Sequence, residues 1–143
     1  MDKKNSILIV DDDTSNLMEL VSILQPEYKI YAVKDGTSAL EKANESEPDL
    51  ILLDVIMPDM NGFEVLARLK QDDKTKDVPV IFITGMNDNE SEREGMEIGA
   101  ADYIRKPFNA TMVKHRVRLH LEIVNLRREL KAATERGLVQ NRT

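Results

Sequence analysis

The chain has 143 residues and a net charge of −6, with 32% of its residues charged. This length is sufficient for one domain with a buried core, and the acidic balance argues against a polyanion-binding protein. The sequence contains no cysteine, which excludes disulfides, thiolate nucleophiles and cysteine-based metal sites. The two histidines, His115 and His120, are five positions apart, off a common helix face; we expect both to be surface residues. With no apolar signal segment and no run of membrane-spanning length, a cytoplasmic protein without a membrane partner is expected.

Five short strand-like runs alternate with segments of helical periodicity. The expected strands are 7–10, 29–33, 50–53, 80–83 and 102–105. Apolar residues at helical spacing predict helices around 17–24, 39–43 and 63–69, then a polar helix at about 89–98 and a long helix opening near 109. This alternation predicts an α/β fold: a doubly wound, flavodoxin-like (βα)5 parallel sheet with strand order 2-1-3-4-5 and a long C-terminal helix.

Polar residues follow four of the expected strands. Asp54 ends the run 50–53 and is followed by Met-Pro-Asp and Asn-Gly turn residues. Ligands of open α/β sheets bind outside the carboxyl ends of the strands. The residues that should meet at this edge are Asp11, Asp12, Asp54, Thr84 and Lys106.

These residue types suit a magnesium-dependent phosphoryl transfer. Three neighbouring carboxylates repel one another, which raises a pKa or requires a cation, and an all-oxygen site favours Mg²⁺. Asp54 would then be the nucleophile, Lys106 would offset negative charge, and Thr84 would donate a hydrogen bond to a phosphoryl oxygen. Each residue also has a simpler interpretation: Asp54 as a turn residue, Asp12 or Asp13 as a helix cap, Thr84 as a strand residue and Lys106 as a solvated charge.

Over residues 6–121 the sequence resembles the receiver domains of two-component response regulators. Asp54 precedes Thr84 by 30 residues and Lys106 by 52, which matches the family. The resemblance rests on the segments Val10-Asp11-Asp12, Leu53-Asp54-Val55-Ile56-Met57-Pro58, Asn61-Gly62, Ile83-Thr84-Gly85, Tyr103 and Lys106-Pro107-Phe108.

The resemblance implies a signalling module, not an enzyme with its own substrate. Asp54 would accept a phosphoryl group from a histidine kinase or a phosphotransfer protein. Asp12, Asp54 and the backbone carbonyl of Ile56 would bind Mg²⁺ directly, with Asp11 helping through water. Thr84 and Tyr103 would form the switch pair, Lys106 would contact the phosphate, and the Lys106-Pro107 bond would be cis.

Three positions depart from the family. Asp13 is an additional carboxylate, which we expect to be a helix cap or a solvated charge. Ile56 and Met86, each two residues beyond a site residue, are apolar where the family is often polar. Both flank the expected path of a hydrolytic water, so we expect slow loss of the phosphoryl group.

The last helix is longer than a receiver requires. Residues 110–136 contain no proline or glycine, and Leu119, Ile123, Leu126, Leu130 and Ala133 follow a heptad spacing. We call Leu119, Ile123, Leu126 and Leu130 the seam. It predicts a parallel helical homodimer; the alternative is an amphipathic helix folded onto its own domain. The basic residues here are interleaved with acids and lack aromatics, so no direct nucleic-acid binding is expected.

We therefore expect a receiver domain at 1–121 and a helical extension or linker at 122–143. The extension would lead to a partner or to an output domain such as a diguanylate cyclase or a histidine kinase. The alternative function is a haloacid-dehalogenase-like phosphatase, because Asp11-Asp12-Asp13-Thr14 after a strand also fits the start of those enzymes, with Asp11 as nucleophile. That alternative leaves Asp54 unexplained.

Overall fold

The computed structural model describes residues 4–85 and 89–137, without the side chains of 89–91. Five parallel strands form one sheet in the order β2-β1-β3-β4-β5, which confirms the predicted topology. The strands are β1 (Ser6–Val10), β2 (Lys29–Val33), β3 (Leu50–Asp54), β4 (Val80–Thr84) and β5 (Asp102–Arg105). The helices are α1 (Thr14–Leu24), α2 (Gly36–Ser46), α3 (Gly62–Gln71), α4 (Asn89–Ile98) and α5 (Ala110–Glu135).

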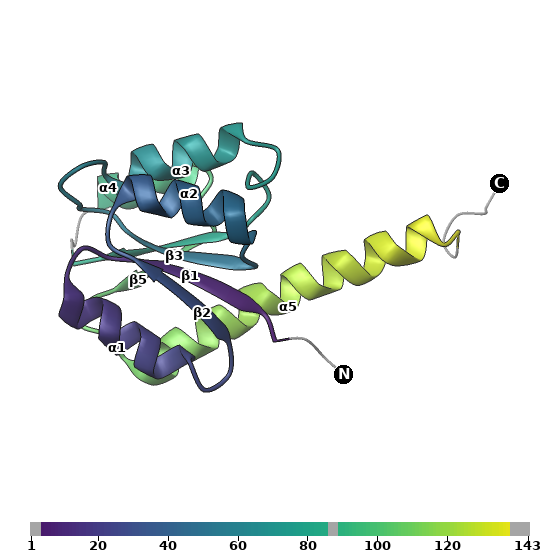
Figure 1. Cartoon of the computed structure of the whole chain (residues 1–143), viewed down its shortest axis with the longest axis horizontal. Helices are drawn as coiled ribbons and strands as arrows, with labels where there is room; N and C mark the ends of the chain where they lie inside the picture. The colour runs from purple at the N-terminus through teal and green to yellow at the C-terminus, as the bar shows by residue number, and fades with distance from the viewer. Residues whose placement is uncertain (1–3, 86–88, 138–143) are drawn as a thin grey trace.

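Helices cover both faces of the sheet, with α2 and α3 on one side and α1 and α5 on the other (Figure 1). Successive side chains of a strand point to opposite faces of the sheet, as the pleat requires, and so belong to different layers of the core. Leu8 and Val10 of β1 belong to the core under α2 and α3. Ile7 and Ile9 belong to the core with α1 and α5. All residues of β3 and β4 are buried, which explains why both read as continuous apolar runs in the sequence.

Short polar side chains cap the helices where the chain leaves the sheet. Asp13, Asp35, Asn61 and Asn109 each accept a backbone N–H from the first turn of the helix that follows. Asn61 forms a capping box with Glu64, because each side chain accepts the other residue's backbone N–H. These caps start α1, α2, α3 and α5 at fixed residues and so set the lengths of the loops at the carboxyl edge.

Helix α5 is partly packed on the domain and partly free of it. Val113, Val117 and Leu121 are buried against the sheet, and beyond them the helix projects away from the domain (Figure 1). None of the helices in the described ranges is apolar and long enough to cross a membrane.

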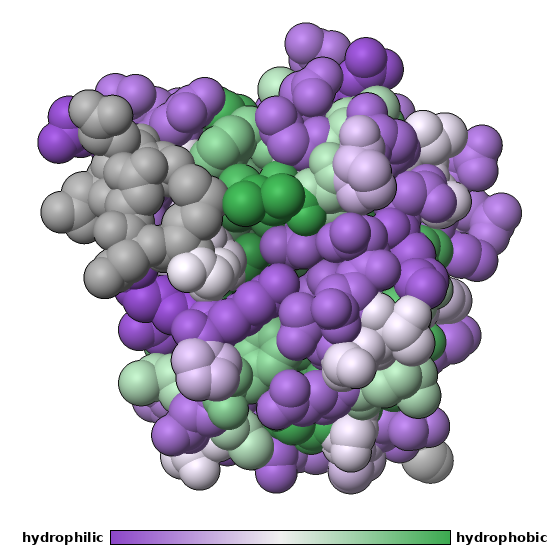
Figure 2. Space-filling model, turned by 90° about the vertical axis from the view of Figure 1, so that its left-hand side faces the viewer, coloured by the Kyte–Doolittle hydropathy of each residue, from purple (hydrophilic) through white to green (hydrophobic). Residues whose placement is uncertain are grey.

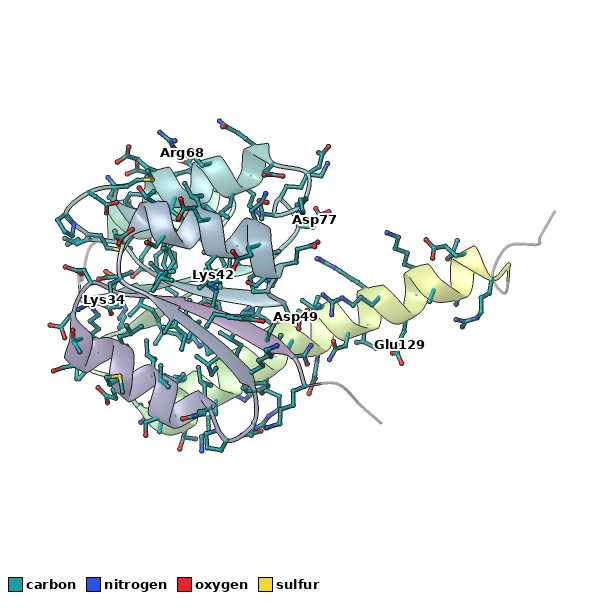
Figure 3. The ribbon with its side chains drawn as sticks, viewed as in Figure 1. Lys34, Lys42, Asp49, Arg68, Asp77 and Glu129 are labelled. Carbon is teal, nitrogen blue, oxygen red and sulfur yellow. The ribbon has the colours of Figure 1, made fainter. Side chains whose placement is uncertain are left out.

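Four polar residues tie α5 to the edge of the sheet where the strands begin; we call them the α5 clamp. Arg128 donates to Asp49 at 2.5 Å, and Asn5 and Asn125 exchange side-chain hydrogen bonds of 3.1 and 3.2 Å. Figure 3 shows Asp49 beside the point where α5 leaves the domain. The direction of the projecting helix is therefore fixed by polar contacts as well as by the core.

His120 is not the surface residue that the sequence analysis expects. Its side chain is 14% exposed, and its Nε2 lies 3.0 Å from Asp102 Oδ2. Arg116, one helical turn earlier, donates to the other oxygen of Asp102 at 2.6 Å. The sequence does not indicate this contact because Asp102 lies on β5, outside the helix. His115 is exposed, as expected.

Candidate functional site

The three aspartates expected at the carboxyl edge lie together. Asp11 directly follows β1, and Asp54 is the last residue of the neighbouring strand β3. One carboxylate oxygen from each of Asp11, Asp12 and Asp54 lies within 4.8 Å of the others. Asp11 is fully buried and Asp54 is 5% exposed, whereas Asp12 is exposed. Figure 2 views the molecule from this side and shows a mainly hydrophilic surface interrupted by several apolar areas, one of them near its centre.

Lys106 joins the cluster from the loop after β5. Its Nζ lies 3.5 Å from Asp11 Oδ2 and 3.5 Å from Asp54 Oδ1. The backbone N–H of Lys106 donates to the carbonyl of Thr84 at 2.9 Å, which joins the ends of β5 and β4. The Lys106-Pro107 peptide bond is cis. One ammonium therefore faces two buried carboxylates.

The cluster contains three carboxylates and one ammonium group, so negative charge exceeds positive charge. Burial, followed by the charge of Asp11, raises the pKa of Asp54 to about 7, although Lys106 lowers it. Among the described residues, buried Asp11 Oδ2 accepts no hydrogen bond, and the Lys106 ammonium lies 3.5 Å from it. The cluster that the described residues form offers three carboxylates, an all-oxygen set of ligands that fits a hard cation such as Mg²⁺.

The loop between β3 and α3 carries the expected carbonyl ligand, Ile56. The side chain of Ile56 is 64% exposed. The loop closes through a 2.7 Å hydrogen bond from Gly62 N–H to the carbonyl of Val55. A Cβ at Gly62 would lie 2.5 Å from the carbonyl oxygen of Asp54, so only glycine fits this approach.

The two expected switch residues lie on neighbouring strands. Thr84 is the last residue of β4 and is 4% exposed. Tyr103 of β5 is half-buried, and its ring centroid lies 5.6 Å from that of Phe82. The Tyr103 hydroxyl donates to the backbone carbonyl of Glu92 in α4 at 2.6 Å. Burial, followed by the charge of Glu92, raises the pKa of this phenol.

The seam is exposed along α5. Leu119, Ile123, Leu126 and Leu130 are 46%, 39%, 62% and 62% exposed. The clamp residues Asn125 and Arg128 face the domain instead. The apolar stripe thus lies on a side of α5 that the domain does not cover.

Two residues near the site have contacts for which the sequence predicts no role. Asp59 binds the first amides of α2, and Gly95 of α4 lies against the Tyr103 hydroxyl. Asp59 follows Pro58 inside a turn, where Asp is common, and Gly95 interrupts a polar helix. A glycine inside a helix is the signal that could have indicated Gly95, since helices disfavour it without a packing reason.

Met86, the second apolar departure from the family, lies outside the described residues.

Comparison with known proteins agrees with the fold. Residues 7–118 match the family model "Response regulator receiver domain". A Vibrio cholerae protein named "Probable cyclic di-GMP phosphodiesterase" is 42% identical over 117 residues, covering 82% of this chain and 26% of that protein. Response regulator PleD of Caulobacter vibrioides is 42% identical over 113 residues, covering 78% of this chain and 25% of PleD. The chain thus spans about a quarter of the length of these curated relatives.

A solved structure agrees as well. The chemotaxis protein CheY4 of Vibrio cholerae superposes with a TM-score of 0.78 at 31% identity, covering 81% of this chain and 98% of that chain. The family model spans most of the chain, over a segment that contains all five strands of the 2-1-3-4-5 sheet. The chain therefore belongs to the family of response regulator receiver domains.

Proposed function

We propose that the chain accepts a phosphoryl group on Asp54 from a histidine kinase or a phosphotransfer protein, with Mg²⁺ as cofactor. The observation that carries this proposal is the position of Asp54, a nearly buried carboxylate at the end of β3, beside Asp11 and 3.5 Å from the ammonium of Lys106. A nucleophile, two further cation ligands and a fixed positive charge converge on one point, which is what phosphoryl transfer requires.

In the proposed reaction, a carboxylate oxygen of Asp54 forms a bond to phosphorus. The bond between phosphorus and the donor atom breaks, and its electron pair leaves with the donor. Asp12, Asp54 and the carbonyl of Ile56 would hold the cation directly, with Asp11 helping through water. The cation would neutralise charge on the transferring oxygens. Lys106 stabilises the remaining negative charge, and the Thr84 hydroxyl donates to a phosphoryl oxygen.

The signal would then pass through Thr84 and Tyr103 to the surface formed by α4, β5 and α5. Phosphorylation changes charge locally, and it acts at a distance only by biasing an element with two arrangements. The Tyr103 hydroxyl now binds Glu92 of α4, so a rotation of Tyr103 would change contacts of α4.

The output is proposed to involve α5. We divide the chain into a receiver at 1–121 and a helical extension at 122–143, with Leu121 as the last buried residue of α5. The exposed seam supports a parallel homodimer, coupled to a partner or to an output domain such as a diguanylate cyclase or a histidine kinase.

The test is chemical labelling in the presence of Mg²⁺ and acetyl phosphate, with intact mass as the readout. We expect one phosphoryl adduct on the wild-type protein and none on Asp54→Asn. Peptide mapping separates the alternative function, since a haloacid-dehalogenase-like phosphatase would carry the label on Asp11. A label on Asp11, or no Mg²⁺-dependent label at all, would refute the proposal.

A further inference from the structure

Asp59 links the loop of the candidate site to a helix that contributes no site residue. It lies five positions after Asp54, between β3 and α3. Its Oδ1 accepts the Gly36 N–H at 3.2 Å, and its Oδ2 accepts both the N–H and the hydroxyl of Thr37 at 3.4 Å. Hydrogen bonds from backbone amides, that of Gly36 first, lower the pKa of Asp59, so its carboxylate is ionised at neutral pH.

These amides are the ones that α2 cannot satisfy itself. The first N–H groups of a helix have no partner within the helix. The cap residue of α2, Asp35, accepts the N–H of Ser38 at 2.8 Å. Asp59 accepts the two preceding N–H groups from outside the helix, and its charge interacts favourably with the positive end of the helix dipole.

The loop and α2 also approach at a distance that only glycine permits. A Cβ at Gly36 would lie 2.8 Å from Met60 Cβ and 3.1 Å from Val65 Cγ2. The carboxylate of Asp59 and the packing of Met60 thus hold one side of the loop against α2. The hydrogen bond from Gly62 to Val55 closes its base. Ile56 lies between these attachments.

We propose that Asp59 is a positioning residue for the Mg²⁺ site: it holds the β3–α3 loop against α2 and so places the backbone carbonyl of Ile56 for the cation. The inference rests on the proposed function. Mg²⁺ demands nearly ideal octahedral geometry, so a carbonyl held loosely is a poor ligand even when it is present. Removing residues that orient metal ligands in other proteins weakens metal binding roughly 10- to 100-fold.

The experiment compares Asp59→Ala with Asp35→Ala, a matched control that removes the other carboxylate from the same helix end. Mg²⁺ is titrated into each protein and into the wild type, and backbone amide NMR shifts report the dissociation constant. We expect Asp59→Ala to raise the constant about tenfold. Asp35→Ala should lower the melting temperature through the lost cap while leaving the constant within about twofold of the wild type.

Two further measurements separate positioning from general stability. In Mg²⁺-free buffer, hydrogen exchange of the Gly62 amide should speed up in Asp59→Ala and not in Asp35→Ala. Asp59→Asn keeps one acceptor oxygen for the Gly36 amide and should recover most of the Mg²⁺ affinity. At saturating Mg²⁺, the phosphorylation rate of Asp59→Ala with acetyl phosphate should return to the wild-type rate, because the reacting groups are intact.

The outcomes are distinct. A dissociation constant for Asp59→Ala within twofold of the wild type, or an equal rise in Asp35→Ala, would overturn the positioning role. A wild-type protein that binds no Mg²⁺ would instead refute the proposed function on which the inference rests. Weaker binding that Asp59→Asn does not recover at all would also count against the hydrogen-bonded tether.

Discussion

At the residue scale, the same side chain has opposite electrostatic roles at different places in this fold. Burial, followed by the charge of Asp11, raises the pKa of Asp54. Burial also raises the pKa of Asp49, but donors from Ser6, Arg128 and Asn5 outweigh it and lower the net value. The difference lies in the donors: Asp49 receives hydrogen bonds from three groups, whereas Asp54 faces another carboxylate. Asp54 is thus a group whose ionisation destabilises the fold.

The raised pKa of Asp54 predicts an unusual pH dependence of the stability of the protein without Mg²⁺. The pKa of Asp54 is about 7 in the folded chain and its ordinary value is 3.8, so the folded state binds more protons between these values. Wild-type stability relative to Asp54→Asn should fall as the pH rises from 5 to 7 and then level off. Thermal unfolding at pH 5, 6, 7 and 8 measures it, and Asp54→Asn should melt several degrees higher at pH 8.

Adding Mg²⁺ at pH 8 is the control for this prediction. The cation should raise the melting temperature of the wild type more than that of Asp54→Asn. A difference between the two proteins that does not change with pH would contradict the raised pKa.

A second residue-scale prediction concerns the lifetime of the phosphorylated state. The apolar side chain of Ile56 is 64% exposed, two residues beyond the proposed acceptor. We expect Ile56→Asn to shorten the phosphoryl half-life several-fold, because a polar side chain can hold a water near the phosphorus. Ile56→Val, which keeps an apolar surface, is the matched control. Intact mass followed over time measures the half-life of the phosphoryl group in each protein. If both variants have the half-life of the wild type, the idea is wrong.

At the element scale, the sequence predicts the strands and most helices because local patterns specify them. The run Ile7-Leu8-Ile9-Val10 forms β1 and alternates between two cores. The parallel order of the strands then brings the residues after β1, β3, β4 and β5 to one edge, and this is why the aspartate cluster could be predicted. The contacts that could not be predicted join distant elements. Asp59 binds an amide 23 positions earlier, and Arg128 binds a carboxylate 79 positions earlier.

Helix α4 provides a prediction about the switch. A Cβ at Gly95 would lie 2.1 Å from the Tyr103 hydroxyl and 2.8 Å from Phe82 Cε2. Gly95→Ala is therefore incompatible with the present arrangement of Tyr103 and α4, and we expect the Tyr103 ring to turn away from α4. We expect the hydrogen bond to Glu92 to break, which a shift of the Tyr103 ring resonances in NMR spectra would report.

Tyr103→Phe is the reference for this change, because it removes the same hydrogen bond without adding a methyl group at position 95. If the Tyr103 resonances of Gly95→Ala stay as in the wild type, α4 itself has moved and the predicted rotation is wrong.

At the scale of the whole molecule, α5 is the element through which we propose that the chain assembles. Its inner face is held by the core and by the α5 clamp, and its seam remains exposed. An isolated exposed leucine is ordinary, but four large apolar residues at heptad spacing on one helix favour a helical partner.

This arrangement predicts which substitutions would abolish the proposed homodimer. Leu126→Asn with Leu130→Asn should raise the dimer dissociation constant more than tenfold, since burial of one leucine contributes roughly 1.5–3 kcal/mol. Lys131→Asn with Glu135→Asn is the matched control, because it lies off the seam and leaves the net charge unchanged. Sedimentation or light scattering across a concentration series measures both, before and after phosphorylation. A monomeric wild type would leave the seam without a role in self-association.

The α5 clamp has a consequence for which molecules can bind at once. Asp49 and Asn5 lie at the beginning of β3 and of β1, and Asp54 lies at the far end of β3. Helix α5 therefore emerges from the side of the domain opposite the aspartate cluster (Figure 1). A phosphodonor protein bound at the cluster would not compete for space with a helix that pairs with the free end of α5. Phosphorylation at the cluster and binding to α5 could then take place at the same time. A dimer would present both of its acceptor sites to donors while it remains assembled.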